Sequence, residues 1–371
     1  EIHMYIDQNQ RVSVVIPAYN AAGTIRMTLI TALAQSHWNL EIIVVDDGST
    51  DKTADVVEEI VAKDRRIRLI RMSNGGVAAA RNRGIKEACG AFVAILDADD
   101  IWHPKKIAKQ LAVFRTGASR LGLVYCWYRE IDEAGRIISN AIFPPYIGDV
   151  YAPLILSNFI GGGSAALIRR SCLEEVSGFD TSLRDRGAQG SEDTKLFLAI
   201  AERYDFGLVP EFLMGYRRTS GNMSQDVSQM SRSKMFVLSE ARSRHPELPR
   251  RLFRWAQGES HLWLATESLY SGRFWPALAL LIRTLLCDPA AVCRQSTVCA
   301  LRDGIRIILQ SVNRSSWIGH PPESIPPGPD FLTVEPDWGI RGVFKLERTS
   351  RPSSFARRQA RAASWRIKRE S

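Results

Sequence analysis

Apolar residues in the first hundred positions of the chain gather in four short, nearly continuous runs. The runs are rich in Val and Ile and are VSVVI (12–16), EIIVV (41–45), IRLI (67–70) and FVAIL (92–96). Unbroken runs of this length are typical of strands that are buried on both faces, as in a parallel sheet. The chain therefore opens with four predicted strands of one parallel sheet.

Segments with helical spacing separate these runs, at residues 23–35, 52–63 and 77–89. The polar residues Ser49, Thr50 and Asp51 precede the second of them and offer caps for the free amides of its first turn. Strands and helices that alternate in this way predict an α/β fold with helices packed on a mostly parallel sheet.

The pattern changes after residue 100 and again near residue 226. We predict a helix at 104–114, a hairpin from 121–128 and 136–139, a strand at 165–168 and a helix at 192–203. Residues 228–310 have helical spacing almost throughout, and five prolines follow within residues 321–329, as in an extended linker. We divide the chain into an α/β domain (11–225, in halves 11–100 and 101–225), a helical extension (226–312) and a Pro-rich linker with a basic tail (313–371).

Composition narrows the class of protein. With 371 residues, of which 45% are hydrophobic and 24% charged, the chain can form one large core with appended elements. Its six cysteines form no CxxC pair, so we expect neither a zinc site nor a disulfide framework. The first ten residues lack a basic and then apolar segment, and the apolar run at 275–282 is far shorter than the ~20 residues of a membrane span. We expect a cytoplasmic protein, with the inner face of the membrane as the alternative location.

The net charge of +9 lies mostly at one end of the chain. Residues 340–371 contain ten Lys or Arg and two Glu, so the remainder is close to neutral and no nucleic-acid partner is expected. Residues 355–369 fit two descriptions. A solvated, disordered tail is favoured because its apolar side is poor, and a basic helix on an anionic membrane surface is the alternative.

Carboxylates follow two of the predicted strands at the point where each strand ends. Asp97 and Asp99 come directly after the run at 92–96, and Asp46 and Asp47 come after the run at 41–45. Ligands of open α/β sheets bind at the carboxyl ends of the strands, and hard divalent cations bridge carboxylates to substrate phosphates. Capping of turns and helices is the competing explanation for each carboxylate.

Three further residues lie at the same predicted edge. Pro17 and Tyr19 follow the first strand, where the Tyr19 ring could stack on a nucleobase or simply pack. Arg81 follows Gly75 and Gly76 at the start of a helix and could reach phosphate oxygens. No GxGxxG is present, so the dinucleotide-binding fingerprint is absent.

Together these segments resemble the inverting glycosyltransferase family 2. Its four marks occur in order: P-x-Y-N at 17–20, V-D-D-G-S-x-D at 45–51, A-R-N-x-G at 80–84 and L-D-x-D-D at 96–100. The resemblance continues through GGGSAALIR (161–169) and GFDTSL (178–183) to the Glu192-Asp193 pair, and it covers roughly residues 11–220. It implies a GT-A fold, a Rossmann-like sheet flanked by helices, here with an α-helical extension and a basic, disordered tail.

The resemblance also implies substrates and roles for single residues. It implies a nucleotide-sugar donor, a glycan or lipid-linked hydroxyl acceptor in cell-surface polysaccharide or glycan synthesis, and a divalent metal, Mn or Mg. The implied roles are donor binding by Pro17, Tyr19, Asp47, Arg81 and Asp97, metal binding by Asp99, and base catalysis by Asp193. Thr219 stands where the family often has histidine, which leaves a third metal ligand open, and Arg217 is a second candidate for the diphosphate.

The expected reaction is a single displacement that inverts the anomeric centre. Asp193 takes the proton of the acceptor hydroxyl, and its place in the first turn of a helix favours the ionised form. QxxRW is absent, so transfer of single sugars is favoured over polymer extrusion. The alternatives are a polyprenyl-phosphate sugar transferase, a non-catalytic nucleotide-sugar-binding relative, and, less favoured, a nucleotidyltransferase. The loops 142–163 and 184–190 are expected to set sugar and acceptor.

Overall fold

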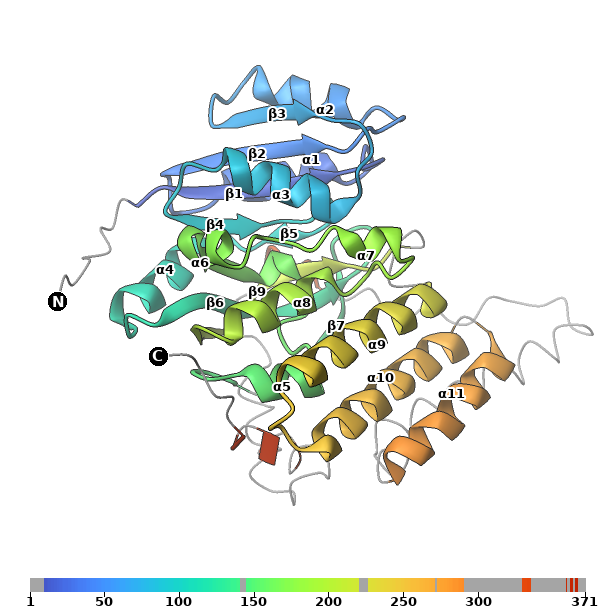
Figure 1. Cartoon of the computed structure of the whole chain (residues 1–371). Coiled ribbons are helices and arrows are strands. Elements are labelled where there is room, and N and C mark those ends of the chain that lie inside the picture. The colour runs from blue at the N-terminus through green and yellow to red at the C-terminus, as the bar shows by residue number, and fades with distance from the viewer. Residues whose placement is uncertain are drawn as a thin grey trace, which may run out of the picture.

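A mixed sheet runs through the α/β part of the molecule (Figure 1). The computed structural model describes residues 10–140, 145–219, 226–270, 272–289, 329–334, 358, 361, 362, 364 and 365. Within them, the strands are ordered β3-β2-β1-β4-β8-β6-β9-β5, and β7 pairs with β6. The strands are β1 (Val12–Ala18), β2 (Leu40–Asp46), β3 (Ile67–Arg71), β4 (Phe92–Ile95), β5 (Ile101–Trp102), β6 (Leu121–Ile131), β7 (Ile137–Asn140), β8 (Ala166–Arg169) and β9 (Asp205–Arg217).

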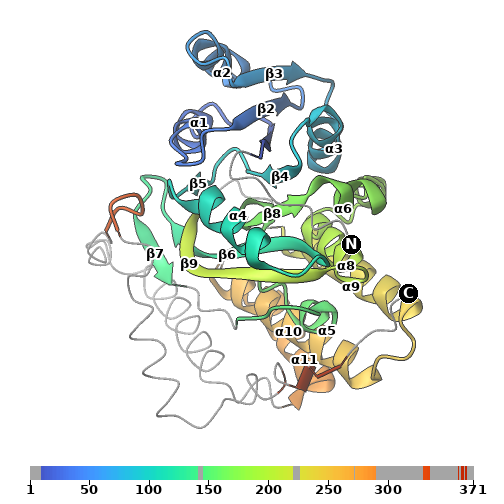
Figure 2. The same ribbon diagram turned by 90° about the vertical axis from the view of Figure 1, so that its left-hand side faces the viewer.

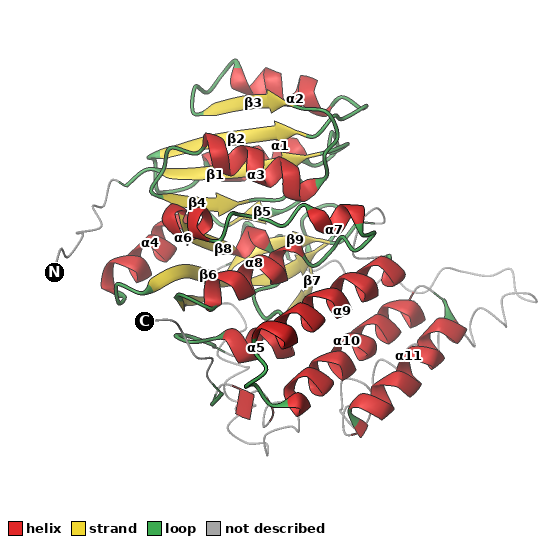
Figure 3. Cartoon of the chain, in the orientation of Figure 1, coloured by secondary structure: helices red, strands yellow, loops and turns green. Residues whose placement is uncertain are grey.

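Helices cover the sheet, and three more helices follow its last strand toward the C-terminus. Figure 3 shows them in red between and beside the strands. The helices are α1 (Ile25–Leu33), α2 (Thr53–Val61), α3 (Val77–Glu87), α4 (Lys106–Thr116), α5 (Tyr151–Leu156), α6 (Arg170–Glu175), α7 (Ser182–Asp185), α8 (Glu192–Ala201), α9 (Val227–Arg244), α10 (Arg250–Tyr270) and α11 (Phe274–Cys287), with a short 3-10 helix at Gly163–Ala165. The predicted elements up to residue 116 and at 121–139, 166–169 and 192–201 are confirmed.

The first half of the sheet is parallel, as predicted. β1 pairs in parallel with β2 and β4, and every residue of β1 and β2 is buried, which explains their unbroken apolar runs. Figures 1 and 2 show α1 and α3 on opposite sides of these strands. α3 lies so close to β1 that a Cβ built on Gly84 would stand 2.3 Å from Cγ1 of Val15. Only glycine allows this approach.

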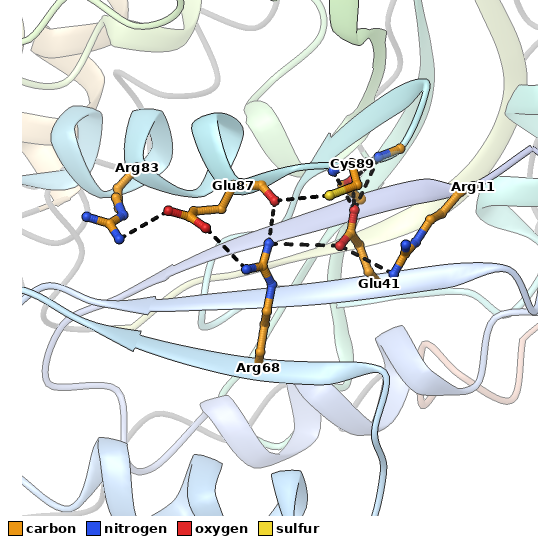
Figure 4. A network of polar contacts seen from close by, with 8 residues as sticks. Arg11, Glu41, Arg68, Arg83, Glu87 and Cys89 are labelled. Atoms are coloured by element: carbon orange, nitrogen blue, oxygen red, sulfur yellow. Dashed lines mark hydrogen bonds and ion pairs between the residues drawn. The ribbon is translucent and has the colours of Figure 1, made fainter.

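A polar network ties the amino ends of these strands to the end of α3 (Figure 4). The buried carboxylate of Glu41, at the start of β2, accepts hydrogen bonds from Ser13 Oγ (2.6 Å) and from the amide of Cys89 (2.7 Å). Arg11 and Arg68 face the same carboxylate at 3.5 and 3.9 Å. Because Glu41 lies at the opposite end of β2 from Asp46, this network belongs to the frame of the fold and not to the ligand-binding edge.

The second half of the sheet contains an element that the apolar pattern did not reveal. β9 pairs in parallel with the whole length of β6, and the register shifts where Val209 faces Cys126 and Phe212 faces Trp127. Pro210 and Glu211 therefore bulge out of the ladder, consistent with the inability of proline to donate a ladder hydrogen bond. This bulge splits the apolar alternation of β9 into two short pieces.

The helical extension begins as predicted and forms one layer. α10 packs between α9 and α11, and the three helices lie side by side in the lower part of Figure 1. In the part of the chain that the structure describes, no helix is long and apolar enough to cross a bilayer. Residues 290–312 of the predicted extension lie outside the described residues.

Parts of the predicted linker and tail are packed, which differs from the expectation of an extended linker and a solvated tail. Phe331 is buried with Ile101, Ile131 and Ile137, and its amide donates to the carbonyl of Gly135 across 3.1 Å. These residues fill an apolar gap beside the β6–β7 hairpin. Apart from residues 329–334, residues 313–357 lie outside the described part.

In the tail, Ala362 is fully buried, and the Trp365 ring stacks on Trp255 of α10 with centroids 5.9 Å apart. An apolar surface of α10 that would otherwise face water accounts for this packing. The expectation of an unpacked tail is therefore wrong for these residues. Within residues 355–369, the structure describes residues 358, 361, 362, 364 and 365.

Candidate active site

The ends of β1 and β2 are joined by an asparagine in a left-handed conformation. Asn20, with φ 49°, accepts a hydrogen bond from the amide of Thr50 at 2.8 Å and donates its own amide to Ser49 Oγ at 3.0 Å. Ser49 and Thr50 thus hydrogen-bond to Asn20 in the loop after β1, whereas Asp51 accepts the amide of Thr53 at the start of α2. Next to this junction, Pro17 is buried in β1 and the Tyr19 ring is exposed. The exposed ring is placed where a nucleobase could stack on it.

Asp47 shapes the loop that leads into α3. Its buried carboxylate accepts the amide of Gly75 on Oδ1 (2.7 Å) and the amide of Gly76 on Oδ2 (2.8 Å). Gly76 has φ 88°, a conformation that side chains other than glycine rarely adopt. Its neighbour Asp46 accepts the amide of Ser49 at 3.1 Å. Both carboxylates therefore bind backbone amides of nearby turns, as the capping explanation holds. Nucleoside binding by Asp47 stays a prediction.

Arg81 brings together two carboxylates that are far apart in the sequence. From its buried place on α3, it donates from Nη2 to Asp97 Oδ1 at 2.7 Å and from Nη1 to Asp193 Oδ1 at 2.9 Å. Its guanidinium also lies over the Phe179 ring, 5.0 Å from the centroid. Burial lowers the pKa of Arg81, but Asp193 and Asp97 outweigh it and raise that pKa above its ordinary value. The predicted donor edge and the predicted base thus meet at one permanent cation.

Asp193 occupies the first turn of α8, as expected for the base. Burial raises the pKa of its carboxyl to about 6, and the charges of Asp97 and Glu192 act in the same direction, while Arg81 and the amide of Gly163 oppose them. The sequence suggested that the helix terminus keeps the pKa of Asp193 low, and this differs from the raised value. With a pKa of about 6, the carboxyl group is still ionised at neutral pH. Glu192 has a different part, since its buried carboxylate accepts the amide of Gly190 at 2.8 Å.

The turn after β4 holds three carboxylates close together. Burial first, and then the charge of Asp97, raise the pKa of Asp99 to about 6. Asp100 is fully enclosed, and its carboxylate accepts Ser164 Oγ at 2.6 Å and the amide of Arg217 at 3.1 Å. Ser164 Oγ in turn accepts the amide of Asp97 at 3.0 Å. Sequence reasoning missed Ser164, although the GGGS segment that carries it had been noted.

The donor set of this turn suits a cation that is shared with a substrate. Among the described residues, no group of three His, Cys, Asp or Glu side chains converges to hold a metal alone. Burial first, and then the charge of Asp97, raise the pKa of Asp99, and a nearby cation would favour its ionised form. One or two carboxylates with substrate phosphates are the usual ligands of Mg²⁺. The residues present therefore fit a metal that arrives with, or is completed by, a diphosphate.

Arg217 braces the backbone beneath the same turn. Its Nε donates to the carbonyl of Asp99 at 2.8 Å, and its Nη1 donates to the carbonyls of Asp132 (2.9 Å) and Glu133 (2.5 Å). These bonds commit Nε and Nη1 to the backbone. Support of this backbone is therefore the alternative role for Arg217, beside the expected contact with a diphosphate.

Two contacts that the sequence did not indicate fasten the 178–190 segment to the donor loop. Asn82 donates to the carbonyl of Phe179 at 2.7 Å and accepts its amide at 2.8 Å. Arg184 of α7 donates to the side-chain oxygen of Asn74 at 2.7 Å. Arg184 belongs to the loop 184–190 that is expected to set sugar and acceptor, and this loop therefore lies beside Asn74 and Gly76.

Sequence comparisons match this part of the chain to known glycosyltransferases. Residues 13–177 match the family described as Glycosyl transferase family 2. An uncharacterized glycosyltransferase of Rickettsia felis (strain ATCC VR-1525 / URRWXCal2) is 31% identical over 222 residues, which are 60% of this chain and 35% of that protein. TuaG of Bacillus subtilis (strain 168), which its name assigns to teichuronic acid biosynthesis, is 45% identical over 101 residues, 27% of this chain and 40% of TuaG. The chain thus spans well under half the length of these relatives.

Solved structures share the fold. The mannosyltransferase PcManGT from Pyrobaculum calidifontis, in complex with GDP-Man and Mn2+, superposes with a TM-score of 0.51 at 22% identity over 82% of each chain. S. aureus TarS 1–349, in complex with UDP-GlcNAc, gives 0.50 at 17% identity over 83% of this chain and 93% of TarS 1–349. Residues 13–177 thus match the glycosyl transferase family 2 model, and the chain has the GT-A fold that these solved structures share.

Proposed function

We propose that the protein transfers a sugar from a nucleotide-diphosphate-sugar to an acceptor hydroxyl, with inversion and with Asp193 as the base. The observation that carries the proposal is the link from Asp193 through Arg81 to Asp97. It places a carboxylate that is ionised at neutral pH next to the strand ends where ligands of such sheets bind. A base must lie within reach of the proton it removes, and this link brings the base to the donor side.

On the donor side, Pro17, Tyr19, Asp47, Arg81 and Asp97 form the proposed nucleotide-sugar site. The exposed Tyr19 ring supports stacking on the base. The Asp47-bound loop brings two backbone glycines to the edge, and the Arg81 cation supplies charge for the diphosphate. GDP-Man in PcManGT and UDP-GlcNAc in TarS make a nucleotide sugar the natural donor to test.

A divalent cation, Mn or Mg, is proposed to be held by Asp99, with Asp97 beside it and the donor phosphates as further ligands. Bound there, the cation would stabilise the negative charge of the departing diphosphate. Ser164 and the Arg217 amide keep Asp100 in place below, so the turn presents Asp99 from a fixed backbone.

The acceptor step uses this chain's own carboxylate. The acceptor oxygen attacks the anomeric carbon as its proton passes to the Asp193 carboxylate, the bond to the nucleoside diphosphate breaks, and one displacement inverts the centre. Arg81, which stays charged, donates to Oδ1 of Asp193 and so orients the carboxylate that would take the proton. We propose a glycan or lipid-linked hydroxyl acceptor in cell-surface polysaccharide synthesis, in the cytoplasm.

A polyprenyl-phosphate acceptor is the competing proposal, because such an acceptor needs little deprotonation. The Arg81–Asp193 pair favours a hydroxyl acceptor, since it keeps a base where a phosphate acceptor would meet negative charge.

The experiment is a screen of GDP- and UDP-sugars for metal-dependent transfer or hydrolysis, followed by NMR of the product. We expect turnover of one donor class with Mn²⁺ or Mg²⁺ and a product anomer opposite to that of the donor. A product with retained configuration would contradict the proposed mechanism, and binding without turnover in the presence of acceptors would favour a non-catalytic relative.

A further inference from the structure

One side of α11 exposes large apolar side chains along its whole length. Trp275 and Leu286 are 75% and 74% exposed, and the neighbours between them on the same side are also exposed. We call this set the α11 stripe: Phe274, Trp275, Leu278, Ile282, Leu285 and Leu286. Contiguous apolar surface of this kind is uncommon on monomeric proteins and marks an interaction site.

The stripe is a second face of the helix and not a frayed part of the core. Ala277, Leu280 and Thr284 are buried on the side that packs against α10, and the stripe recurs at intervals of three and four residues on the other side. α11 contains no Asp or Glu, and its one charged residue is Arg283, which is exposed. An ordinary surface helix carries polar residues on its outer face, and α11 lacks such a polar face.

Exposed basic residues lie beside the stripe. Arg273 precedes α11 and Arg283 lies within it, and both are exposed. At the other end, Arg358 of the tail is largely buried in an ion pair with Asp288, so the exposed charge comes from Arg273 and Arg283. The exposed Arg251 lies over the Trp365 ring at 5.0 Å, and this contact fixes the tail beside the same end of the helical layer.

We propose that the α11 stripe docks on an anionic lipid bilayer, with Phe274 and Trp275 in the interface and the flanking arginines at the headgroups. A helix with an apolar face that carries Trp, Phe and Leu, bordered by Arg, is the composition of an interfacial helix. Each basic residue near an anionic surface adds about 1 kcal/mol of attraction.

A second copy of the chain would also cover the stripe, and the measurements below separate the two occupants. The basic tail has a poor apolar side, and in this proposal α11 supplies the apolar surface for membrane binding. The inference does not depend on the proposed sugar transfer.

The test is co-sedimentation of the full chain with phosphatidylglycerol–phosphatidylcholine vesicles, compared with pure phosphatidylcholine vesicles. We expect wild-type protein to pellet with the anionic vesicles and to be released by salt. Trp275→Glu/Leu286→Glu should weaken partition by at least about tenfold, which corresponds to 1.4 kcal/mol. Trp38→Glu is the matched control, since Trp38 is 67% exposed between α1 and β2, and it should bind like wild type.

Several outcomes would overturn the inference. Wild-type protein that stays in the supernatant at low salt would contradict lipid docking. A double variant that still pellets like Trp38→Glu would contradict it as well. A dimer that light scattering detects and that the double variant dissolves would assign the stripe to a second copy. A double variant that unfolds more readily than wild type would assign the stripe to a segment of this chain.

Arg283 is exposed, so Arg283→Glu should lower vesicle binding without changing the melting temperature. It therefore keeps the test valid if the double variant does not fold. Donor hydrolysis by the double variant should equal that of the wild type. A failure of lipid docking is thereby distinguished from a failure of the proposed function.

Discussion

Arg81 Nη1 lies 2.9 Å from Asp193 Oδ1, so the carboxylate proposed as the base is ion-paired before any substrate arrives. The same guanidinium holds Asp97 with its other terminal nitrogen. One buried cation therefore fixes the spacing between the donor side and the acceptor side of the site. Because Arg81 is charged throughout the accessible pH range, the pairing orients Asp193 and keeps its ionised form available.

Asp193→Asn should abolish transfer and spare donor binding, since the amide keeps the shape but cannot take a proton. We expect kcat to fall by about 10²–10⁴-fold, the usual contribution of a general base, with the donor Kd unchanged. Transfer kinetics and calorimetric titration of the donor measure the two quantities. Asp55→Asn, an exposed carboxylate on α2, is the control. Turnover of the Asp193→Asn protein near the wild-type level would remove Asp193 from the mechanism.

The pH profile should report the raised pKa of Asp193. Its carboxyl has a pKa of about 6 in the ligand-free protein and must be ionised to act, so log kcat/KM should fall with decreasing pH below about 6 and level off above it. Initial rates at subsaturating donor and acceptor, from pH 3 to pH 8, give the profile. A break near 3.8, the ordinary value for aspartate, would mean that burial does not control this group in the working enzyme.

Asp99→Asn should remove the metal-dependent part of nucleotide binding. The expected result is the loss of the rise in melting temperature that Mn²⁺ and a nucleoside diphosphate give together, because linkage stabilises only the protein that binds. Asp55→Asn should keep the whole rise. An Asp99→Asn protein that responds to Mn²⁺ like the control would show that the cation is held elsewhere.

Ser164→Ala should loosen the turn that carries Asp97 and Asp99. The substitution leaves the enclosed carboxylate of Asp100 and the amide of Asp97 each without one partner, at a cost of about 1–3 kcal/mol in the free energy of unfolding. Urea titration measures it. Ser243→Ala is the control, since the exposed Ser243 hydroxyl donates only to Ser239 O within α9. Equal effects of the two substitutions would mean that the Ser164 hydroxyl does not hold the turn.

Gly84→Ala should destabilise the donor half of the sheet. The added Cβ would meet Val15 Cγ1 at 2.3 Å, and overpacking of this kind costs about 1–3 kcal/mol. Gly23→Ala is the matched control, because a Cβ at Gly23 has nothing within 4 Å. Gly84→Ala in a Val15→Ala background should recover part of the loss, and a double-mutant cycle without coupling would contradict the proposed contact.

The parallel half of the fold could be predicted from the sequence because its strands are buried on both faces and leave unbroken apolar runs. β9 could not, because Gly207 and Pro210 interrupt its pattern and the bulge depends on tertiary contacts with β6 and with Lys109 of α4. The packing of Phe331 depends on a gap beside a distant hairpin, which no local pattern encodes.

The site follows the same division. The rule that ligands bind at the carboxyl ends of strands placed Asp47, Asp97 and Asp99 at one edge, which the structure confirms. The link from Arg81 to Asp193 and the place of Ser164 depend on how separate segments meet in space. The sequence also could not tell Glu192 from Asp193, whose adjacent carboxylates face different partners.

The burial of Phe331 against Ile101 and Ile137 has a consequence for the order in which the protein is synthesised. Ile101 directly follows Asp100, so the wall behind the carboxylate turn is complete only after Phe331 has left the ribosome. The β6–β7 hairpin emerges far earlier, and at 5–20 residues per second the interval is about 10–40 s. During that time the nascent α/β domain lacks the cover over Ile101, Ile131 and Ile137 beside the turn of Asp97 and Asp99, and a fragment that ends at residue 312 would lack it permanently.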